Sequence, residues 1–300
     1  EMEWFGHPLN YPKNLRKGKK TKATILDYLQ LGIDVLNGFN HPIEAKGQCI
    51  DHFNSVFSKE FRNKFIKPFF RGVFLDPEFE KSINQYRYYL HCFFRRGAAV
   101  PKKGMKEIPL QLLKSLSKDH IEYDATVTRV DDNAVWINEK KHQFKHVVLA
   151  TDFSTCYRLL NIPLPSNPWC SVTNYILAKK GETDLAPLLL VSKKSTVSHI
   201  NIPTLISTDL APEGTHYMNV SAFGEYNPKS IEAEVHALTK ESDWSFVWHD
   251  HIANGLPRFQ LRPQITSSTI SVCGDWTLFP SIEGAILSGH KVAKRIKRFL

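Results

Sequence analysis

In the first hundred residues, apolar positions recur with the period of an α-helix. One set predicts a helix that ends near Gly38. It consists of Ile25, Leu26, Leu29, Ile33 and Leu36. A second set repeats every four residues until Pro68 and Gly72 interrupt it. It consists of Phe53, Phe57, Phe61, Phe65 and Phe69. Because aromatic stripes at this spacing usually face a protein interior, we expect the phenylalanines to form a core.

From residue 100 the pattern changes to period two, which is typical of β-strands. After a turn and a short helix over 110–116, we expect strands over 121–130, 134–137 and 143–150, with polar turns at 131–133 and 139–141. Later strands are expected over 171–178, 186–191 and 216–223, and an amphipathic helix over 231–238. The apolar strand that ends at Ala150 has the composition of a buried strand in an α/β sheet.

Composition is that of a globular protein with a sizeable core, because 42% of the 300 residues are hydrophobic. The sequence contains no run of about 18 apolar residues, so no transmembrane helix is expected. The first residues do not resemble a signal peptide. The cysteines are odd in number and never in C-x-x-C spacing: Cys49, Cys92, Cys156, Cys170 and Cys273. We therefore expect reduced thiols, a cytoplasmic location and no metal site.

The net charge of +9 allows three kinds of partner: nucleic acid, an anionic membrane surface or an anionic ligand. Cations are dense at residues 16–22 and near the C-terminus. Neither zinc-finger spacing nor an RNA-binding aromatic motif is present, so we expect no nucleic-acid partner. Peripheral membrane contact through basic and phenylalanine-rich surfaces remains an alternative.

The most specific pattern lies near the C-terminus, over residues 270–297. An apolar strand leads into a Gly-Asp turn, a short loop and a helix that starts near Ser281. The start of a helix carries N–H groups without internal partners and the positive end of the helix dipole. Beside the carboxylate of the turn, such a helix suits a ligand that has both hydroxyl groups and an anionic edge.

This run resembles the closing segment of the flavin-containing amine oxidase and phytoene desaturase superfamily: an apolar strand, G-D, a spacer, S-x-x-G-A, then S-G. The matching positions are Gly274, Asp275, Ser281, Glu283, Gly284, Ala285, Ser288 and Gly289. Weaker likenesses are Met105 and Ile108 in a turn, Val127 and Val130 in a meander, the strand end 147–150, and the stretch 244–259. The resemblance extends from about residue 53 to the end of the chain.

The resemblance implies an α/β (α+β) fold, in which the remainder of a two-dinucleotide-binding-type FAD domain is interleaved with a mixed-sheet plus helical substrate domain. Residues 1–99 would be the helical part of the substrate domain. Residues 100–158 would supply a helix, the β-meander and a buried strand of the FAD domain. Residues 159–262 would form the mixed sheet, and residues 263–300 the C-terminal FAD-binding strand and helix.

The resemblance also assigns roles at an FAD site. Asp275 would bond the ribityl or pyrophosphate region, with Gly274 allowing close approach of the backbone. Val127 would pair its backbone with the adenine, and the strand-end residues Ala150 and Thr151 would lie against the cofactor. The amides that would face the pyrimidine edge of the flavin are those of Ile282, Glu283, Gly284 and Ala285. No catalytic acid or base emerges from the sequence.

Two departures accompany the resemblance. None of the fifteen glycines forms the G-x-G-x-x-G turn that cradles a dinucleotide phosphate. We therefore expect an N-terminal lobe to be absent from these residues or carried on another chain, and FAD binding to be weak or absent without it. In addition, Lys103 stands where family members have a glycine before Gly104.

The activity implied is oxidation of an apolar or polyunsaturated small molecule by hydride transfer to FAD. An amine oxidase is one alternative. A non-catalytic scaffold or interaction module derived from the same fold is the other.

Overall fold

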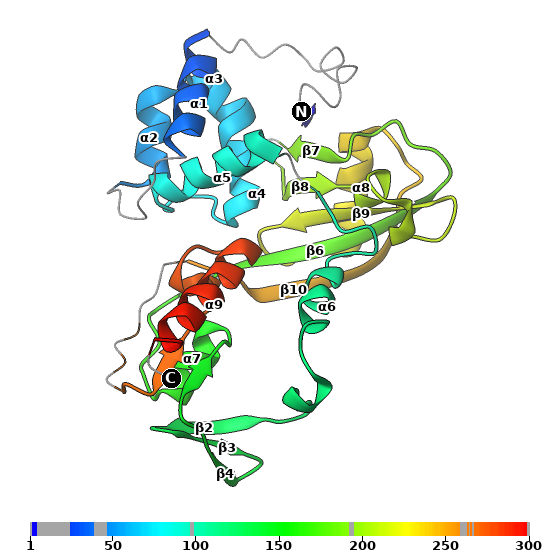
Figure 1. Ribbon diagram of the computed structural model, residues 1–300. Coiled ribbons are helices and arrows are strands. Elements are labelled where there is room, and N and C mark those ends of the chain that lie inside the picture. The colour runs from blue at the N-terminus through cyan, green and yellow to red at the C-terminus, as the bar shows by residue number, and fades with distance from the viewer. Residues whose placement is uncertain are drawn as a thin grey trace. The chain divides into compact units, whose positions relative to one another are not determined.

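The computed structural model describes residues 2–4, 25–38, 47–96, 99–191, 195–258, 263, 265 and 267–298. The chain divides into two compact units (Figure 1). Unit 1 comprises Glu1–Leu112 and Cys170–Gly255, and unit 2 comprises Leu113–Trp169 and Leu256–Leu300. The expected assignment of residues 1–99, 100–158, 159–262 and 263–300 to substrate and cofactor domains stays a prediction. The basic stretch 16–22 lies outside the described residues.

The helices of unit 1 confirm the helical pattern of the first hundred residues. They are α1 (Ile25–Asn37), α2 (Cys49–Val56), α3 (Lys59–Phe61), the π-helical turn η2 (Arg62–Ile66), α4 (Lys67–Phe74) and α5 (Ile83–Arg96), followed by α6 (Glu107–Leu113). The phenylalanine stripe forms a core as expected. Phe53, Phe57, Phe61 and Phe69 are buried, and Phe65 stacks between Phe61 and Phe69 with ring centroids 5.1 and 6.2 Å away.

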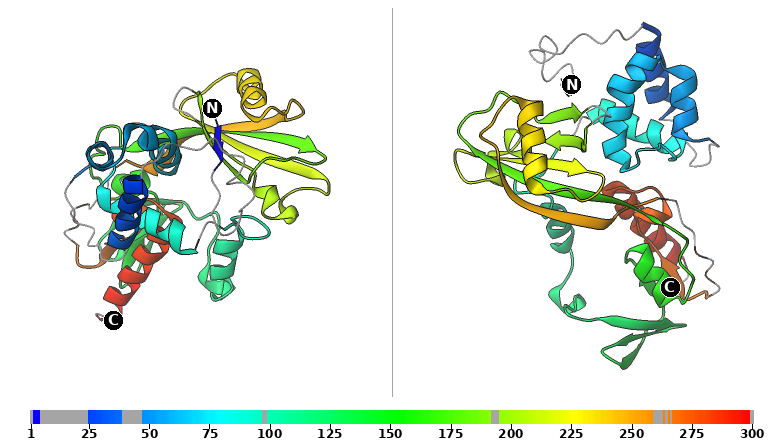
Figure 2. Two further views of the ribbon diagram at one scale, coloured as in Figure 1. Left: turned by 90° about the horizontal axis from the view of Figure 1, so that it is seen from above. Right: turned by 180° about the vertical axis from the view of Figure 1, so that it is seen from behind.

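Unit 1 also contains a six-stranded sheet with the order β1-β7-β8-β9-β6-β10. Its strands are β1 (Met2–Trp4), β6 (Trp169–Lys180), β7 (Leu188–Val191), β8 (Val197–Asn201), β9 (Thr215–Ala222) and β10 (Ser245–Pro257). Helix α8 (Pro228–Thr239) lies across one face (Figure 2), where Ile231 and Val235 pack on Tyr175, Leu177 and Val220. The short 3₁₀ turns η4 (Pro203–Leu205) and η5 (Thr208–Leu210) follow β8.

Unit 2 holds two smaller sheets. The antiparallel meander consists of β2 (Val127–Asp131), β3 (Ala134–Ile137) and β4 (Lys140–Gln143), and the parallel pair consists of β5 (Val147–Leu149) and β11 (Ile270–Val272). Around them lie η3 (Lys118–His120), α7 (Phe153–Leu159), η6 (Asp275–Thr277) and α9 (Ile282–Ile296). Val147, Leu149, Phe153 and Trp276 belong to its core. This mixture of helices and sheets confirms the predicted α+β class.

The strands differ from the sequence prediction in several places. The strand expected over 121–130 begins only at Val127, and β1 and β10 were not among the expected strands. Residues 140–143 form β4 rather than a polar turn, and the turn falls instead at Asn138 and Glu139, which both have positive φ (48° and 65°). That geometry is the one a tight two-residue hairpin needs. Strand β8 was not predicted, because a register shift between Val197 and His199 breaks the alternation that reveals a strand.

No helix in the described ranges is long and apolar enough to cross a membrane. All five cysteines are free thiols, and each except Cys92 is buried.

Candidate functional site

The parallel pair in unit 2 brings two predicted site segments together. Strands β5 and β11 run side by side, with Val147 opposite Ile270 and Leu149 opposite Val272, so their carboxyl ends meet at one edge. Ala150 and Thr151 follow β5, and Gly274 and Asp275 follow β11. The indole Nε1 of Trp276 donates to the carbonyl oxygen of Thr151 at 3.1 Å, which joins the two turns directly.

Gly274 occupies a position where a residue with a side chain would not fit. Its φ is +155°, and a Cβ atom there would overlap the buried indole of Trp276. The Gly274 amide donates to Ser288 Oγ at 2.8 Å, and Ser288 Oγ donates to the carbonyl oxygen of Ala285 at 2.7 Å. These two bonds fix the turn after β11 against the first turns of α9.

The start of α9 is capped by Ser281. Its Oγ accepts from the Gly284 amide at 2.9 Å, and its carbonyl oxygen accepts from the Ala285 amide at 3.0 Å. Two of the four amides assigned to a ligand therefore already have acceptors within the helix start. Ile282 holds the first helical position, where an α-helix supplies no internal acceptor for the amide.

Asp275 is a partly buried carboxyl group at this edge. Burial raises its pKa, and hydrogen bonds from the amide of Trp276 and from its own amide act in the opposite direction. Within the described part of the chain, no cationic side chain pairs with it. Its surroundings therefore favour a hydroxyl donor over a phosphate, because a phosphate would place a second negative charge beside it.

Val127 occupies a different place from the other predicted residues. It lies on β2, an edge strand of the meander, and pairs with Ile137 on β3. Its side chain packs against the core that contains Val147 and Phe153. The backbone role that the resemblance gives it, contact with an adenine, stays a prediction.

Several apolar side chains of unit 2 are exposed, three of them in the first two turns of α9. Ile282, Ile286 and Leu287 are 36% to 52% exposed, and Val148 on β5 is 41% exposed. The helix turns Gly284 and Ser288 inward instead. The first turns of α9 therefore present apolar side chains to the surface of unit 2.

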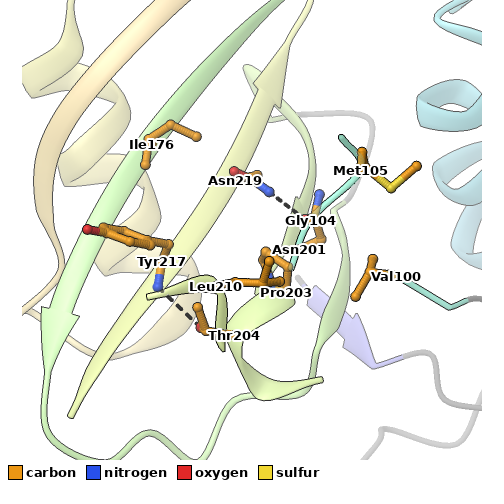
Figure 3. Close-up of a pocket in the computed structure, with 10 residues that line it drawn as sticks. All are labelled: Val100, Gly104, Met105, Ile176, Asn201, Pro203, Thr204, Leu210, Tyr217 and Asn219. Atoms are coloured by element: carbon orange, nitrogen blue, oxygen red, sulfur yellow. Dashed lines mark hydrogen bonds between the residues drawn. The ribbon is translucent and has the colours of Figure 1, made fainter. Parts of the chain in front are cut away.

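Unit 1 contains a pocket of about 410 Å³ on the sheet (Figure 3). Ile176 on β6, Asn219 on β9 and Asn201 on β8 are cross-strand neighbours, so they form one row across three strands. Leu177 and Met218, which are next to Ile176 and Asn219 in the sequence, are buried in the core beneath α8. Because successive side chains of a strand point to opposite faces, the row lies on the other face of the sheet. The lining consists of Val100, Gly104, Met105, Ile176, Asn201, Pro203, Thr204, Leu210, Tyr217 and Asn219.

The turn 100–105 forms part of the pocket wall and is held by hydrogen bonds. Gly104 donates its amide to the Pro101 carbonyl oxygen at 2.9 Å, and Ser207 Oγ donates to the Lys102 carbonyl oxygen at 2.7 Å. Gly104 takes a φ of +92°, whereas Lys103 does not have positive φ. The lysine that replaces a family glycine is therefore accommodated without left-handed backbone.

None of the ten lining residues carries a charge. The main polar feature is an amide pair, in which Asn219 Nδ2 donates to Asn201 Oδ1 at 2.9 Å. Thr204 Oγ1 accepts from the Tyr217 amide at 3.2 Å. Such a lining suits an uncharged ligand that is mostly apolar. Sequence reasoning had named Gly104 and Met105 but not the row, because the row depends on β8 and on the register of three strands.

The described residues hold no group of three or more His, Cys, Asp or Glu side chains arranged to bind a metal ion.

Comparison with known proteins gives a family and a fold. The family model described as flavin containing amine oxidoreductase matches residues 5–176. No curated protein sequence matches the chain.

Solved structures with the same fold include three proteins of low sequence identity. An oxidoreductase from Methanosarcina mazei is 16% identical over 90% of this chain and 73% of its own, with a TM-score of 0.71. A protein from Pyrococcus furiosus is 12% identical over 89% and 71%, with a TM-score of 0.68. A putrescine oxidase variant is 13% identical over 99% and 78%, with a TM-score of 0.66.

Proposed function

Because the chain belongs to the family of flavin-containing amine oxidoreductases, we propose that it is an FAD-dependent oxidoreductase that acts on an uncharged, apolar or polyunsaturated small molecule. The match of the family model to residues 5–176, more than half of the chain, carries the oxidoreductase assignment. The cofactor, the substrate and the residues below are the finer parts of the proposal.

The donor set at the β5–β11 edge fits an FAD. When bound, the flavin supplies the hydride acceptor that no amino-acid side chain provides. Asp275 would accept a hydrogen bond from a ribityl hydroxyl, which satisfies a partly buried carboxylate. The Ile282 amide and the positive end of the α9 dipole would favour an electron-rich edge of the ligand.

The pocket in unit 1 supports an uncharged substrate over an amine. One of the structural neighbours is a putrescine oxidase, and putrescine carries ammonium groups. An ammonium group removed from water needs a carboxylate or comparable partner, and the pocket lining contains none. An apolar chain with one hydrogen-bonding group would instead meet the apolar walls and the Asn201–Asn219 amide pair.

The cofactor assignment is tested by equilibrium titration of FAD with the purified chain, followed by its fluorescence. We expect weak binding that Asp275→Asn weakens by about a further tenfold, since a neutral amide oxygen accepts a weaker hydrogen bond than a carboxylate does. Asp132→Asn changes an exposed aspartate of the same unit and should leave the affinity unchanged. Equal affinity of the two variants would contradict the assignment.

The same FAD-loaded protein then tests the substrate class. Under anaerobic conditions, an uncharged polyene should bleach the visible flavin band, whereas a diamine should not. The reverse order would support an amine oxidase in place of the proposed activity.

A further inference from the structure

Helix α1 in unit 1 is packed with its polar side inward and its apolar side outward. Only Asp27, Leu31 and Asp34 of its side chains are buried. Six large apolar or aromatic side chains are between 50% and 76% exposed. They are Ile25, Leu26, Tyr28, Leu29, Ile33 and Leu36, and we call them the outer face of α1.

The buried aspartates have specific partners, which fixes the orientation of the helix. Asp27 accepts from the amide and from the hydroxyl of Ser58, both at 2.7 Å. Asp34 lies 2.8 Å from His52 Nε2 and accepts from Arg87 Nε at 3.1 Å and from the Tyr86 hydroxyl at 3.2 Å. Rotating the outer face inward would break these bonds and bury carboxylates without partners, which is costly.

The outer face of α1 is wide and carries no charge. At about 100° per residue, its six side chains span an arc of roughly 160°. Gly32 falls within this arc, and a Cβ atom there would meet nothing within 4 Å. The helix has 13 residues and is therefore about 20 Å long, which is too short to cross a bilayer but long enough to lie in its surface.

Charge in the sequence indicates the partner. The stretch that leads into α1 contains Arg16, Lys17, Lys19, Lys20 and Lys22 and no acidic residue between them, and the whole chain carries +9. An apolar helix face joined to clustered cations is the combination that binds anionic lipid surfaces. A second copy of the chain would bring a further +9 toward the same face, which opposes self-association.

We propose that the outer face of α1 docks into the surface of an anionic lipid membrane, with the helix in the plane of the interface. This inference does not depend on the proposed oxidoreductase activity. The surface that would contact the membrane is the outer face of α1 and not the phenylalanine stripe, which lies in the core.

The test is co-sedimentation of the full chain with vesicles of phosphatidylcholine alone and with added phosphatidylserine. We expect binding only to the anionic vesicles and its loss at high salt. The double variant Leu29→Asp with Ile33→Asp should reduce partitioning by about a hundredfold or more, because two buried aliphatic side chains are lost. Val247→Asp, at an exposed apolar position of β10, should bind like the parent chain.

A second variant gives a gain rather than a loss. Gly32→Leu adds an aliphatic side chain to the centre of the outer face and should strengthen binding to anionic vesicles about tenfold. Circular dichroism must show that each variant keeps the helical content of the parent chain.

Three results would overturn the proposal. These are vesicle binding unaffected by the double variant, equal binding of neutral and anionic vesicles, and a dimer in light scattering that the double variant converts to a monomer. The last result would assign the face to a second copy of the chain.

Discussion

His199 on β8 is a histidine kept neutral by its surroundings. Its ring packs so closely on α4 that a Cβ atom at Gly72 would lie 2.6 Å from Nδ1. Arg71 next to Gly72 donates to the Val197 carbonyl oxygen at 3.1 Å. Burial, together with the Arg71 guanidinium, lowers the pKa of His199 from 6.5 to about 4. A protonated imidazole at this position would lose hydration and face a cation.

This environment predicts how stability depends on pH. Between pH 6.5 and about 4, the unfolded chain takes up a proton at His199 that the folded chain does not. The free energy of unfolding therefore decreases as the pH is lowered through this range. The loss should approach about 3 kcal/mol, and no contribution remains above pH 6.5. His199→Gln should remove this part of the pH dependence in urea unfolding at pH 7.5, 5.5 and 4.5. His120→Gln, at an exposed histidine, should retain it.

Single residues also show what the sequence could predict at the candidate site. Gly274, Asp275 and Thr151 were found because strand, turn and helix follow one another locally, and the structure brings those turns together. The pocket row escaped prediction because Ile176, Asn201 and Asn219 are neighbours only through strand register. Long-range register is set by packing and turn geometry, which a single sequence does not display.

At the scale of elements, α9 contains two glycines, of which one has no room for a side chain and the other has open space around it. A Cβ atom at Gly284 would overlap the carbonyl oxygen of Phe279, so this glycine lets the helix start approach the preceding loop. A Cβ atom at Gly289 would meet nothing within 4 Å. Both match the family pattern, yet only Gly284 is required by packing.

The two alanine variants should therefore change stability in opposite directions. Gly284→Ala should destabilise the protein by about 1–3 kcal/mol, because the new methyl group displaces α9 from the loop. Gly289→Ala should stabilise it by about 1 kcal/mol, because glycine is a poor helix former. Thermal unfolding of the two variants beside the parent chain measures both effects. Equal shifts in melting temperature would show that Phe279 does not restrict the start of α9.

Element prediction succeeded where one face of a segment is apolar and failed where it is not. The helix over Ile25–Asn37 follows from its period, but its direction of packing does not, because Asp27 and Asp34 find partners 18 to 53 residues away. Strand β4 has the sequence Lys-Lys-His-Gln and is held by pairing with β3. Its side chains alone give no strand signal.

Across the whole molecule, the thiols are distributed over both units and are almost all enclosed. Cys49 and Cys170 are buried in unit 1, and Cys156 and Cys273 are buried in unit 2. Burial raises the pKa of Cys156 to about 12 and also raises the pKa values of Cys49 and Cys273. Since the thiolate is the reactive form, burial protects these groups both sterically and chemically.

Thiol reactivity should therefore report the folding of both units in one experiment. With Ellman's reagent at pH 8, we expect fast reaction of Cys92 alone in the native protein and of all five cysteines in denaturant. Increasing urea should expose the remaining four, and Cys49→Ala or Cys156→Ala identifies the unit that opens first, since the missing signal belongs to one unit. Five fast thiols in native buffer would contradict the enclosed cores, because a buried thiol becomes reactive only when its surroundings open.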